Sequence, residues 1–268
     1  MKELLLRSVS GVLYISIVIL TLFTSHKWFI TLFLILGLIA LFEFLRLIRF
    51  NSLVHYLFLI ILIYFFSYRE MEPVWVYLFL ACTLIVNLIL LIRLFISKVK
   101  PHKNPFVKFL NTVFYLIGGF VFLTLIPGHG DSFEPWVIFG IFLLVWSNDT
   151  FAYLIGKSMG KRKLFKSVSP NKTIEGFFGG LIGTVIISFI IFKYTLLFNF
   201  GIWMTMAILV TVFGTLGDLI QSRFKRNAGV KDSGIMMPGH GGLYDRLDSI
   251  LFASPVLFTF LEIVNYVS

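Results

Sequence analysis

The chain has 268 residues and a formal charge of +10; 58% of its residues are hydrophobic, 13% are charged, and the mean hydropathy is +0.94. A soluble globular domain has about 45–50% apolar and about 25% charged residues, so this composition excludes an ordinary soluble protein and predicts a membrane protein. The single cysteine, Cys82, excludes an intramolecular disulfide and a cysteine-based zinc site.

Nine apolar runs are candidate membrane-spanning helices, because about 20 apolar residues cross a bilayer core about 30 Å thick. In chain order the runs are 8–25, 28–45, 53–67, 74–95, 108–126, 136–156, 174–192, 200–217 and 250–267. We therefore predict an all-α integral membrane protein with about nine transmembrane helices. Residues 1–135 form its N-terminal transmembrane region, and residues 136–268 form a C-terminal transmembrane domain with long polar loops.

The basic residues alternate from one connection to the next. The N-terminal segment and the connections after the even-numbered runs hold 20 of the 23 lysines and arginines, whereas the other connections hold only Lys27, Arg69 and Lys193. The positive-inside rule places the N-terminus and the loops 157–173 and 217–249 in the cytoplasm, in a multi-pass protein of the cell (inner) membrane. Because these charges flank membrane segments, we expect no nucleic-acid partner.

The sixth run and the loop after it contain the first polar motifs. Asp149, in "WSNDTFAY", carries a charge inside an apolar run, where it is costly and usually faces a polar cavity; a hydrogen bond between helices is the alternative. In "SPNKT", Ser169 and Pro170 have the form of an N-cap and a first helical residue. A helix start favours an anion, and Lys172 in its first turn predicts a bound phosphate. A plain basic anchor at the lipid surface is the alternative.

The end of the eighth run predicts a second polar face. In "GDLIQSRFKR", the residues Asp218, Ser222, Lys225 and Arg226 share one face if the helix continues beyond the membrane. A carboxylate, a hydroxyl and two cations on one face suit a metal-bound phosphate. An ordinary solvated helix end with an internal ion pair is the alternative.

The segment "KDSGIMMPGHGGLYDRLDS" leads into the ninth run. The glycines on either side of His240 allow the backbone to come close to a ligand, although His240 alone is ambiguous because "PGHG" also occurs at 127–130. Asp245 and Asp248 share a face if the last helix begins there, and Asp218 and Asp245 could meet across the loop. Magnesium prefers carboxylate and phosphate oxygens, so these two aspartates are candidate metal ligands.

The segment from Ser222 to Asp248, "SRFKRNAGVKDSGIMMPGHGGLYDRLD", resembles the signature of the phosphatidate cytidylyltransferases, also called CDP-diacylglycerol synthases. "SPNKTIEGFFGG" and "NDTFAY" resemble two further blocks of that family, so the resemblance covers about Trp146 to Ser249. It implies transfer of CMP from CTP to phosphatidate in phospholipid biosynthesis, giving CDP-diacylglycerol and pyrophosphate with magnesium present. A second, monovalent or divalent cation is left open.

The resemblance also implies the roles of individual residues. The catalytic residues are Asp218, Lys225, Arg226, Asp245, Arg246 and Asp248. The substrate-binding residues are Asp149, Ser169, Lys172, Thr173, Ser222, Lys231, His240, Gly241 and Gly242. Asp218 and Asp245 hold the metal, at an active site on the cytoplasmic face of the membrane. The partners are CTP, phosphatidate and the bilayer, and a homodimer is compatible with the sequence.

Two other classes of protein compete with this interpretation. A CDP-alcohol phosphotransferase carries Asp-Gly-x-x-Ala-Arg, and this chain has no Asp-Gly dipeptide. A proton- or ion-coupled transporter could use Asp149 as its carboxylate in the middle of the membrane. Such a transporter would not need the polar loop from Asp218 to Asp248, and it would leave CTP unconsumed.

Overall fold

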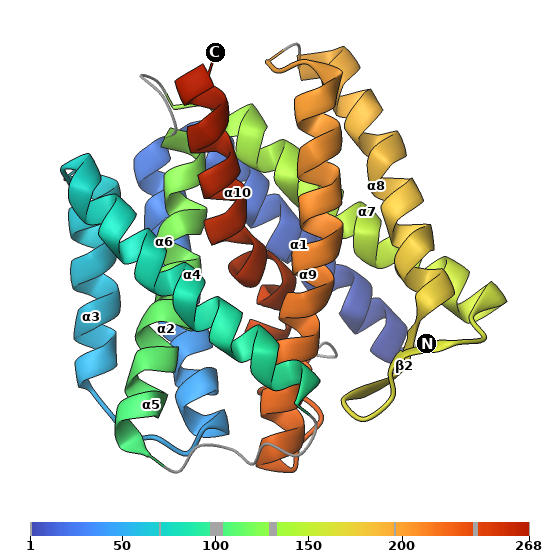
Figure 1. The fold of residues 1–268 in the computed structure, drawn as a ribbon, viewed down its shortest axis with the longest axis horizontal. Helices are drawn as coiled ribbons and strands as arrows, with labels where there is room; N and C mark the ends of the chain where they lie inside the picture. The colour runs from blue at the N-terminus through green and yellow to red at the C-terminus, as the bar shows by residue number, and fades with distance from the viewer. Residues whose placement is uncertain are drawn as a thin grey trace.

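The computed structural model describes residues 2–69, 71–96, 104–128, 133–195, 197–237 and 241–267, and these are almost entirely helical (Figure 1). The α-helices are α1 (Lys2–Thr24), α2 (His26–Leu47), α3 (Val54–Ile63), α4 (Pro73–Phe95), α5 (Pro105–Leu110), α6 (Gly118–Leu125), α7 (Pro135–Met159), α8 (Ile174–Thr195), α9 (Phe200–Ala228) and α10 (Asp248–Val267). Short π-helical segments extend α3 through η1 (Tyr64–Tyr68) and join α5 to α6 through η2 (Asn111–Ile117). The short 3₁₀ turns are η3 (Ile126–Gly128) and η4 (Tyr244–Arg246).

Each of the nine predicted apolar runs lies within a helical segment, to within one residue at its ends, which confirms an all-α membrane protein. Seven helical segments of the described chain are long and apolar enough to cross a membrane, and the apolar parts of the other two, Val9–Thr24 and Val54–Tyr68, are shorter. The starts of α2, α5 and α9 have side-chain caps. Asn104 Oδ1 accepts a hydrogen bond from Phe106 N at 2.9 Å, with Pro105 in the first helical turn.

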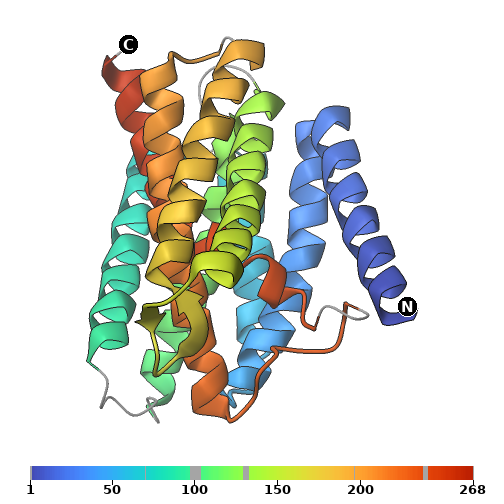
Figure 2. The ribbon, with the colours of Figure 1, turned by 90° about the vertical axis from the view of Figure 1, so that its right-hand side faces the viewer.

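Helices α7 to α10 pack side by side, and α1 and α2 lie together at another side of the molecule (Figure 2). Small residues allow α7 and α8 to approach closely. A Cβ atom at Gly179 would lie 2.5 Å from Ile155 Cβ, and one at Gly183 would collide with the Phe151 ring. Such glycine contacts are how helices in a membrane pack closely without a hydrophobic driving force.

The prediction of a helix start at Ser169 is wrong. The strands β1 (Lys163–Phe165) and β2 (Ser169–Thr173) form an antiparallel hairpin, and α8 begins only after this hairpin. The reason is that Pro170 holds the preceding residue in an extended conformation, and proline is tolerated in an edge strand as well as in a first helical turn. The cap is supplied by Thr173, whose Oγ1 accepts a hydrogen bond from Gly176 N at 3.1 Å.

The predicted continuation of the eighth helix is confirmed. Helix α9 runs to Ala228 and ends at Gly229, whose φ of +78° is the left-handed conformation that glycine adopts readily at a helix end. The last helix begins at Asp248, so Asp245 lies in the preceding turn η4 and does not share a helical face with Asp248. We call residues 229–247, which join α9 to α10, the signature loop.

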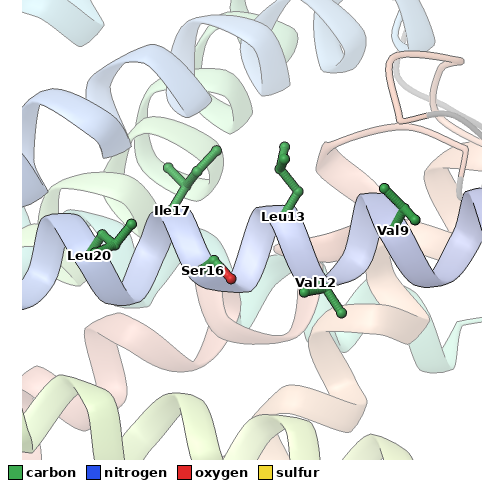
Figure 3. Close-up of a pocket in the computed structure, with 6 residues that line it drawn as sticks. All are labelled: Val9, Val12, Leu13, Ser16, Ile17 and Leu20. Atoms are coloured by element: carbon green, nitrogen blue, oxygen red, sulfur yellow. The ribbon is translucent and has the colours of Figure 1, made fainter.

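A pocket of about 530 Å³ lies along α1 (Figure 3). Its lining consists of Val9, Val12, Leu13, Ser16, Ile17 and Leu20. None of the predicted catalytic or substrate-binding residues that the structure describes contributes to this lining. Its nearly uniform aliphatic surface suits hydrocarbon rather than a charged nucleotide.

Candidate active site

The first polar cluster joins the hairpin to α9. Lys172 of β2 forms an ion pair with Asp218 of α9, and Ser222 Oγ donates a hydrogen bond to Asp218 Oδ1 at 3.2 Å. The side chains of Lys172 and Asp218 are 30% and 26% exposed. Two polar segments that lie far apart in the sequence are therefore in contact, and their charged groups remain accessible to a ligand.

Two further carboxylates surround this ion pair. Asp149 of α7 and Asp248 of α10 lie within electrostatic range of both Lys172 and Asp218. Burial alone would lower the pKa of Lys172, but the charge and hydrogen bond of Asp218, followed by the charges of Asp149 and Asp248, outweigh burial and raise that pKa. Lys172 is therefore a stable cation among three aspartates contributed by three different helices.

A second ion pair, Lys225–Asp245, is more deeply buried. Lys225 Nζ lies 2.8 Å from Asp245 Oδ1, and the two side chains are 11% and 8% exposed. Asp245 Oδ1 also accepts from Gln221 Nε2 at 3.0 Å, while Oδ2 accepts from the backbone N–H groups of Ser233 at 2.9 Å and Gly242 at 3.1 Å. Both oxygens of Asp245 are thus occupied by donors of the protein itself.

The hydrogen bonds of Asp245 set its ionisation. Burial alone would raise the pKa of Asp245, but the Lys225 ammonium and the two backbone N–H groups outweigh burial and lower that pKa. Asp245 therefore remains a carboxylate at neutral pH. It joins α9 to both ends of the segment from Ser233 to Gly242.

The model of the Cytidylyltransferase family matches residues 5–264. The chain belongs to this family. It is 42% identical over 177 residues to the phosphatidate cytidylyltransferase of Staphylococcus haemolyticus (strain JCSC1435), covering 64% of this chain and 66% of that protein. It is 44% identical over 163 residues to the phosphatidate cytidylyltransferase of Staphylococcus aureus (strain COL), covering 58% of this chain and 60% of that protein.

The alignment with each of these relatives therefore spans less than two thirds of the relative's length. The family match itself extends further than the sequence motifs indicated. The resemblance from about Trp146 to Ser249 lies in the C-terminal half, whereas the match also includes almost all of the N-terminal half. The first helices therefore belong to the same cytidylyltransferase architecture.

Other predicted site residues have local structural contacts. Arg226 Nε donates to Val168 O at 3.3 Å and its Nη1 donates to Val230 O at 2.9 Å, so this guanidinium ties α9 to the hairpin and to the signature loop. Gly241, with a φ of +88°, occupies the left-handed conformation that favours glycine. Lys231 is exposed. The predicted role of His240 concerns a residue outside the described part of the chain.

Arg246 and Ser169 complete the predicted set. Arg246 lies within electrostatic range of Asp149, so it belongs to the first cluster. Ser169 lies opposite Phe165 in the hairpin and is half-buried. The first cluster thus gathers its charged side chains from α7, α9, α10, β2 and η4.

Sequence reasoning missed two residues on which the signature loop rests. Glu43 of α2 is 2% exposed and accepts hydrogen bonds from Ser233, Leu243 and Tyr244. Tyr115 of η2 lies with its hydroxyl 2.6 Å from that of Tyr244. The sequence did contain a signal for Glu43. Like Asp149, it is a carboxylate inside an apolar run, where a charge is costly and needs polar partners.

The carboxylates fit a magnesium ion that is shared with a substrate. The described residues contain no ready-made group of three or more His, Cys, Asp or Glu side chains arranged to hold a metal. Magnesium, however, is commonly held by one or two carboxylates together with substrate phosphates. Asp218, which is partly exposed and close to two other aspartates, offers that kind of donor, whereas the oxygens of Asp245 are already hydrogen-bonded.

Proposed function

We propose that the protein transfers CMP from CTP to phosphatidate, producing CDP-diacylglycerol and pyrophosphate. The observation that carries the proposal is the accessible Lys172–Asp218 ion pair, with Asp149 and Asp248 beside it, in a cytidylyltransferase-family chain. Two relatives, 42% and 44% identical over the aligned residues, are named phosphatidate cytidylyltransferase. The site and the family support the same reaction class.

The reaction asks little of the protein beyond charge neutralisation and alignment. A phosphatidate oxygen attacks the α-phosphorus of CTP, one P–O bond forms, and the bond to the leaving pyrophosphate breaks. The nucleophile is already an anion, so no strong base is needed. Lys172 can exchange its contact with Asp218 for a phosphate oxygen, because the ion pair is accessible and the ammonium stays charged.

Magnesium, when bound, would offset the negative charge of the substrate phosphates. We propose Asp218 as its first protein ligand, since this carboxylate would be released when Lys172 turns to phosphate. Asp245 could serve as a ligand only by giving up hydrogen bonds to Lys225, Ser233 or Gly242. Titration of turnover with monovalent and divalent cations tests for a second cation.

We place the site at the cytoplasmic face of the cell membrane. This placement is supported by the distribution of the lysines and arginines. Of these 23 residues, 20 lie in the N-terminal segment and in the connections after the even-numbered apolar runs. A soluble nucleotide and a lipid can meet only at a membrane edge. Single cysteines in 157–168 and 127–134, in a Cys82→Ser background, should be labelled from opposite faces of sealed vesicles; labelling from the same face would contradict the topology.

The reaction is tested by incubating purified protein with CTP, phosphatidate and magnesium and counting label in the lipid extract. With CTP labelled at the α-phosphate, the lipid should gain one label per pyrophosphate released. With CTP labelled at the γ-phosphate, the lipid should stay unlabelled, which separates cytidylyl transfer from phosphoryl transfer. Diacylglycerol in place of phosphatidate should give no product. Absence of α-label from the lipid would overturn the proposal.

A further inference from the structure

Glu43 connects the N-terminal helices directly to the signature loop. Its carboxylate is 2% exposed, on the apolar helix α2. Oε2 accepts hydrogen bonds from Ser233 Oγ at 2.9 Å and Tyr244 N at 2.9 Å, and Oε1 accepts from Leu243 N at 3.1 Å. A buried carboxylate is costly, and these three uncharged donors satisfy both of its oxygens.

The loop backbone packs tightly around this carboxylate. A Cβ atom at Gly234 or at Gly242 would collide with the Glu43 carboxylate. The two glycines follow and precede the groups that donate to Glu43. The loop therefore adopts a conformation that depends on close packing against the Glu43 carboxylate.

Glu43 and Asp245 hold the same two stretches of the loop. Ser233 donates from its hydroxyl to Glu43 and from its backbone N–H to Asp245, at 2.9 Å in both cases. On the other stretch, Gly242 N donates to Asp245 and Leu243 N donates to Glu43. One carboxylate is supplied by α2, and the other is itself paired with Lys225 of α9.

We propose that Glu43 is a positioning residue of the active site, which fixes the signature loop so that η4 and the start of α10 present Arg246 and Asp248 to the substrates. Phe44, the next residue on α2, supports the same turn, because its ring packs edge-on against Tyr244 at a centroid distance of 5.7 Å. The inference rests on the proposed function. It assigns an active-site task to the N-terminal half of the chain.

The first test is Glu43→Gln, which keeps the size of the side chain, removes one acceptor oxygen and sets an NH₂ group against the loop donors. A small displacement of reacting groups can cost on the order of 100-fold in rate, so we expect kcat/KM to fall about 10- to 100-fold, mainly through kcat. Amide hydrogen exchange at Leu243 and Tyr244 should become faster. The matched control is Glu262→Gln, which removes a carboxylate that accepts from Tyr77 Oη at 2.7 Å on other helices and should change neither quantity.

A second variant separates positioning from general stability. Ser233→Ala removes one of the three donors and leaves Glu43 in place, so the variant remains informative if Glu43→Gln fails to fold. Both single variants act on one contact, and the double variant Glu43→Gln/Ser233→Ala should therefore lose no more kcat/KM than Glu43→Gln alone. Independent, multiplicative losses would overturn the inference.

The remaining outcomes are also decisive. A lower unfolding temperature with unchanged kcat/KM per folded molecule would make Glu43 a structural residue only and would overturn the inference. If the wild-type protein lacked cytidylyl transfer, the proposed function would fail, while hydrogen exchange would still test the contact. Unchanged exchange at Leu243 and Tyr244 in Glu43→Gln would overturn the inference by itself.

Discussion

The ion pairs Lys172–Asp218 and Lys225–Asp245 use the same two kinds of charge on and around α9, but their surroundings differ. In the first pair the side chains are 30% and 26% exposed, and Asp218 has one further side-chain hydrogen bond, from Ser222. In the second pair they are 11% and 8% exposed, and three further donors occupy the carboxylate. We call them the open pair and the closed pair.

The difference shows how one helix can serve both chemistry and architecture. A partly solvated ion pair contributes little to stability, so its partners can separate when a ligand offers better ones. A buried and fully hydrogen-bonded pair is costly to break, because removing one partner leaves an uncompensated charge. We expect variants of the open pair to affect turnover and variants of the closed pair to affect folding.

The largest effect should follow from breaking the closed pair. Lys225→Met leaves the buried Asp245 carboxylate without its cation, which should destabilise the protein by about 3–5 kcal/mol. Thermal unfolding in detergent measures the loss. Adding Asp245→Asn should restore part of the stability by removing the unpaired charge, and Lys161→Met, at an exposed lysine, serves as the control. An unfolding temperature equal to the wild type in Lys225→Met would show that the closed pair is not structural.

The two aspartates can be compared directly with the same conservative change. Asp218→Asn should lower kcat about 100-fold, as expected when a protein ligand of the metal is lost, and it should leave the unfolding temperature nearly unchanged. Excess magnesium should rescue it weakly. Asp245→Asn should mainly lower the unfolding temperature.

The opposite result would reassign the metal. If Asp245→Asn abolished turnover while its unfolding temperature stayed at the wild-type value, Asp245 would be the better candidate for the metal ligand. The comparison between the open and the closed pair would then fail at its central point.

A smaller effect is expected for the cation of the open pair. Lys172→Ala should change the free energy of unfolding by no more than about 0.5 kcal/mol, because the side chain is partly solvated. Loss of a charge-assisted contact to phosphate should cost about 1.5–3 kcal/mol in kcat/KM for CTP. Lys166→Ala, at an exposed lysine in the turn of the same hairpin, is the matched control. Normal kinetics with lost thermal stability in Lys172→Ala would reverse the assignment.

Much of the fold could be predicted because hydropathy is a local property. The nine apolar runs could be located without knowledge of their neighbours, and the extension of α9 to Ala228 followed from the common face of its polar residues. The β-hairpin could not be predicted, since Ser169 and Pro170 suit both a helix start and an edge strand. The choice between a helix start and an edge strand is decided only by packing against α7 and by the cap from Thr173.

It was easier to predict which residues belong to the site than to predict which of them form ion pairs with each other. Motifs pointed to Lys172, Asp218 and Asp245, but which carboxylate meets which lysine depends on how α7, α8 and α9 pack. The partners of Glu43 could not be predicted for the same reason, because they lie 190 to 201 residues further along the chain. A sequence indicates that a buried charge needs partners, but it does not identify them.

The smallest predicted effect concerns acid stability and tests the closed pair once more. The pKa of Asp245 is lowered, because Lys225 and two backbone N–H groups outweigh the effect of burial. A carboxyl group whose pKa is lower in the folded than in the unfolded chain stabilises the fold above its unfolded pKa, about 3.9, and this contribution is lost as pH falls through the folded pKa. Wild-type stability should therefore decline below about pH 4 in part because Asp245 gains a proton.

Asp245→Asn cannot take up that proton, so its unfolding temperature should start lower and decline less between about pH 5 and pH 3. Asp232→Asn, at an exposed aspartate of the same loop, should keep the wild-type decline. The measurement is the unfolding temperature of the three proteins across this pH range. Parallel declines in the wild type and Asp245→Asn would mean that the hydrogen bonds around Asp245 do not favour its charged form, and the closed pair would lose its distinction from the open one.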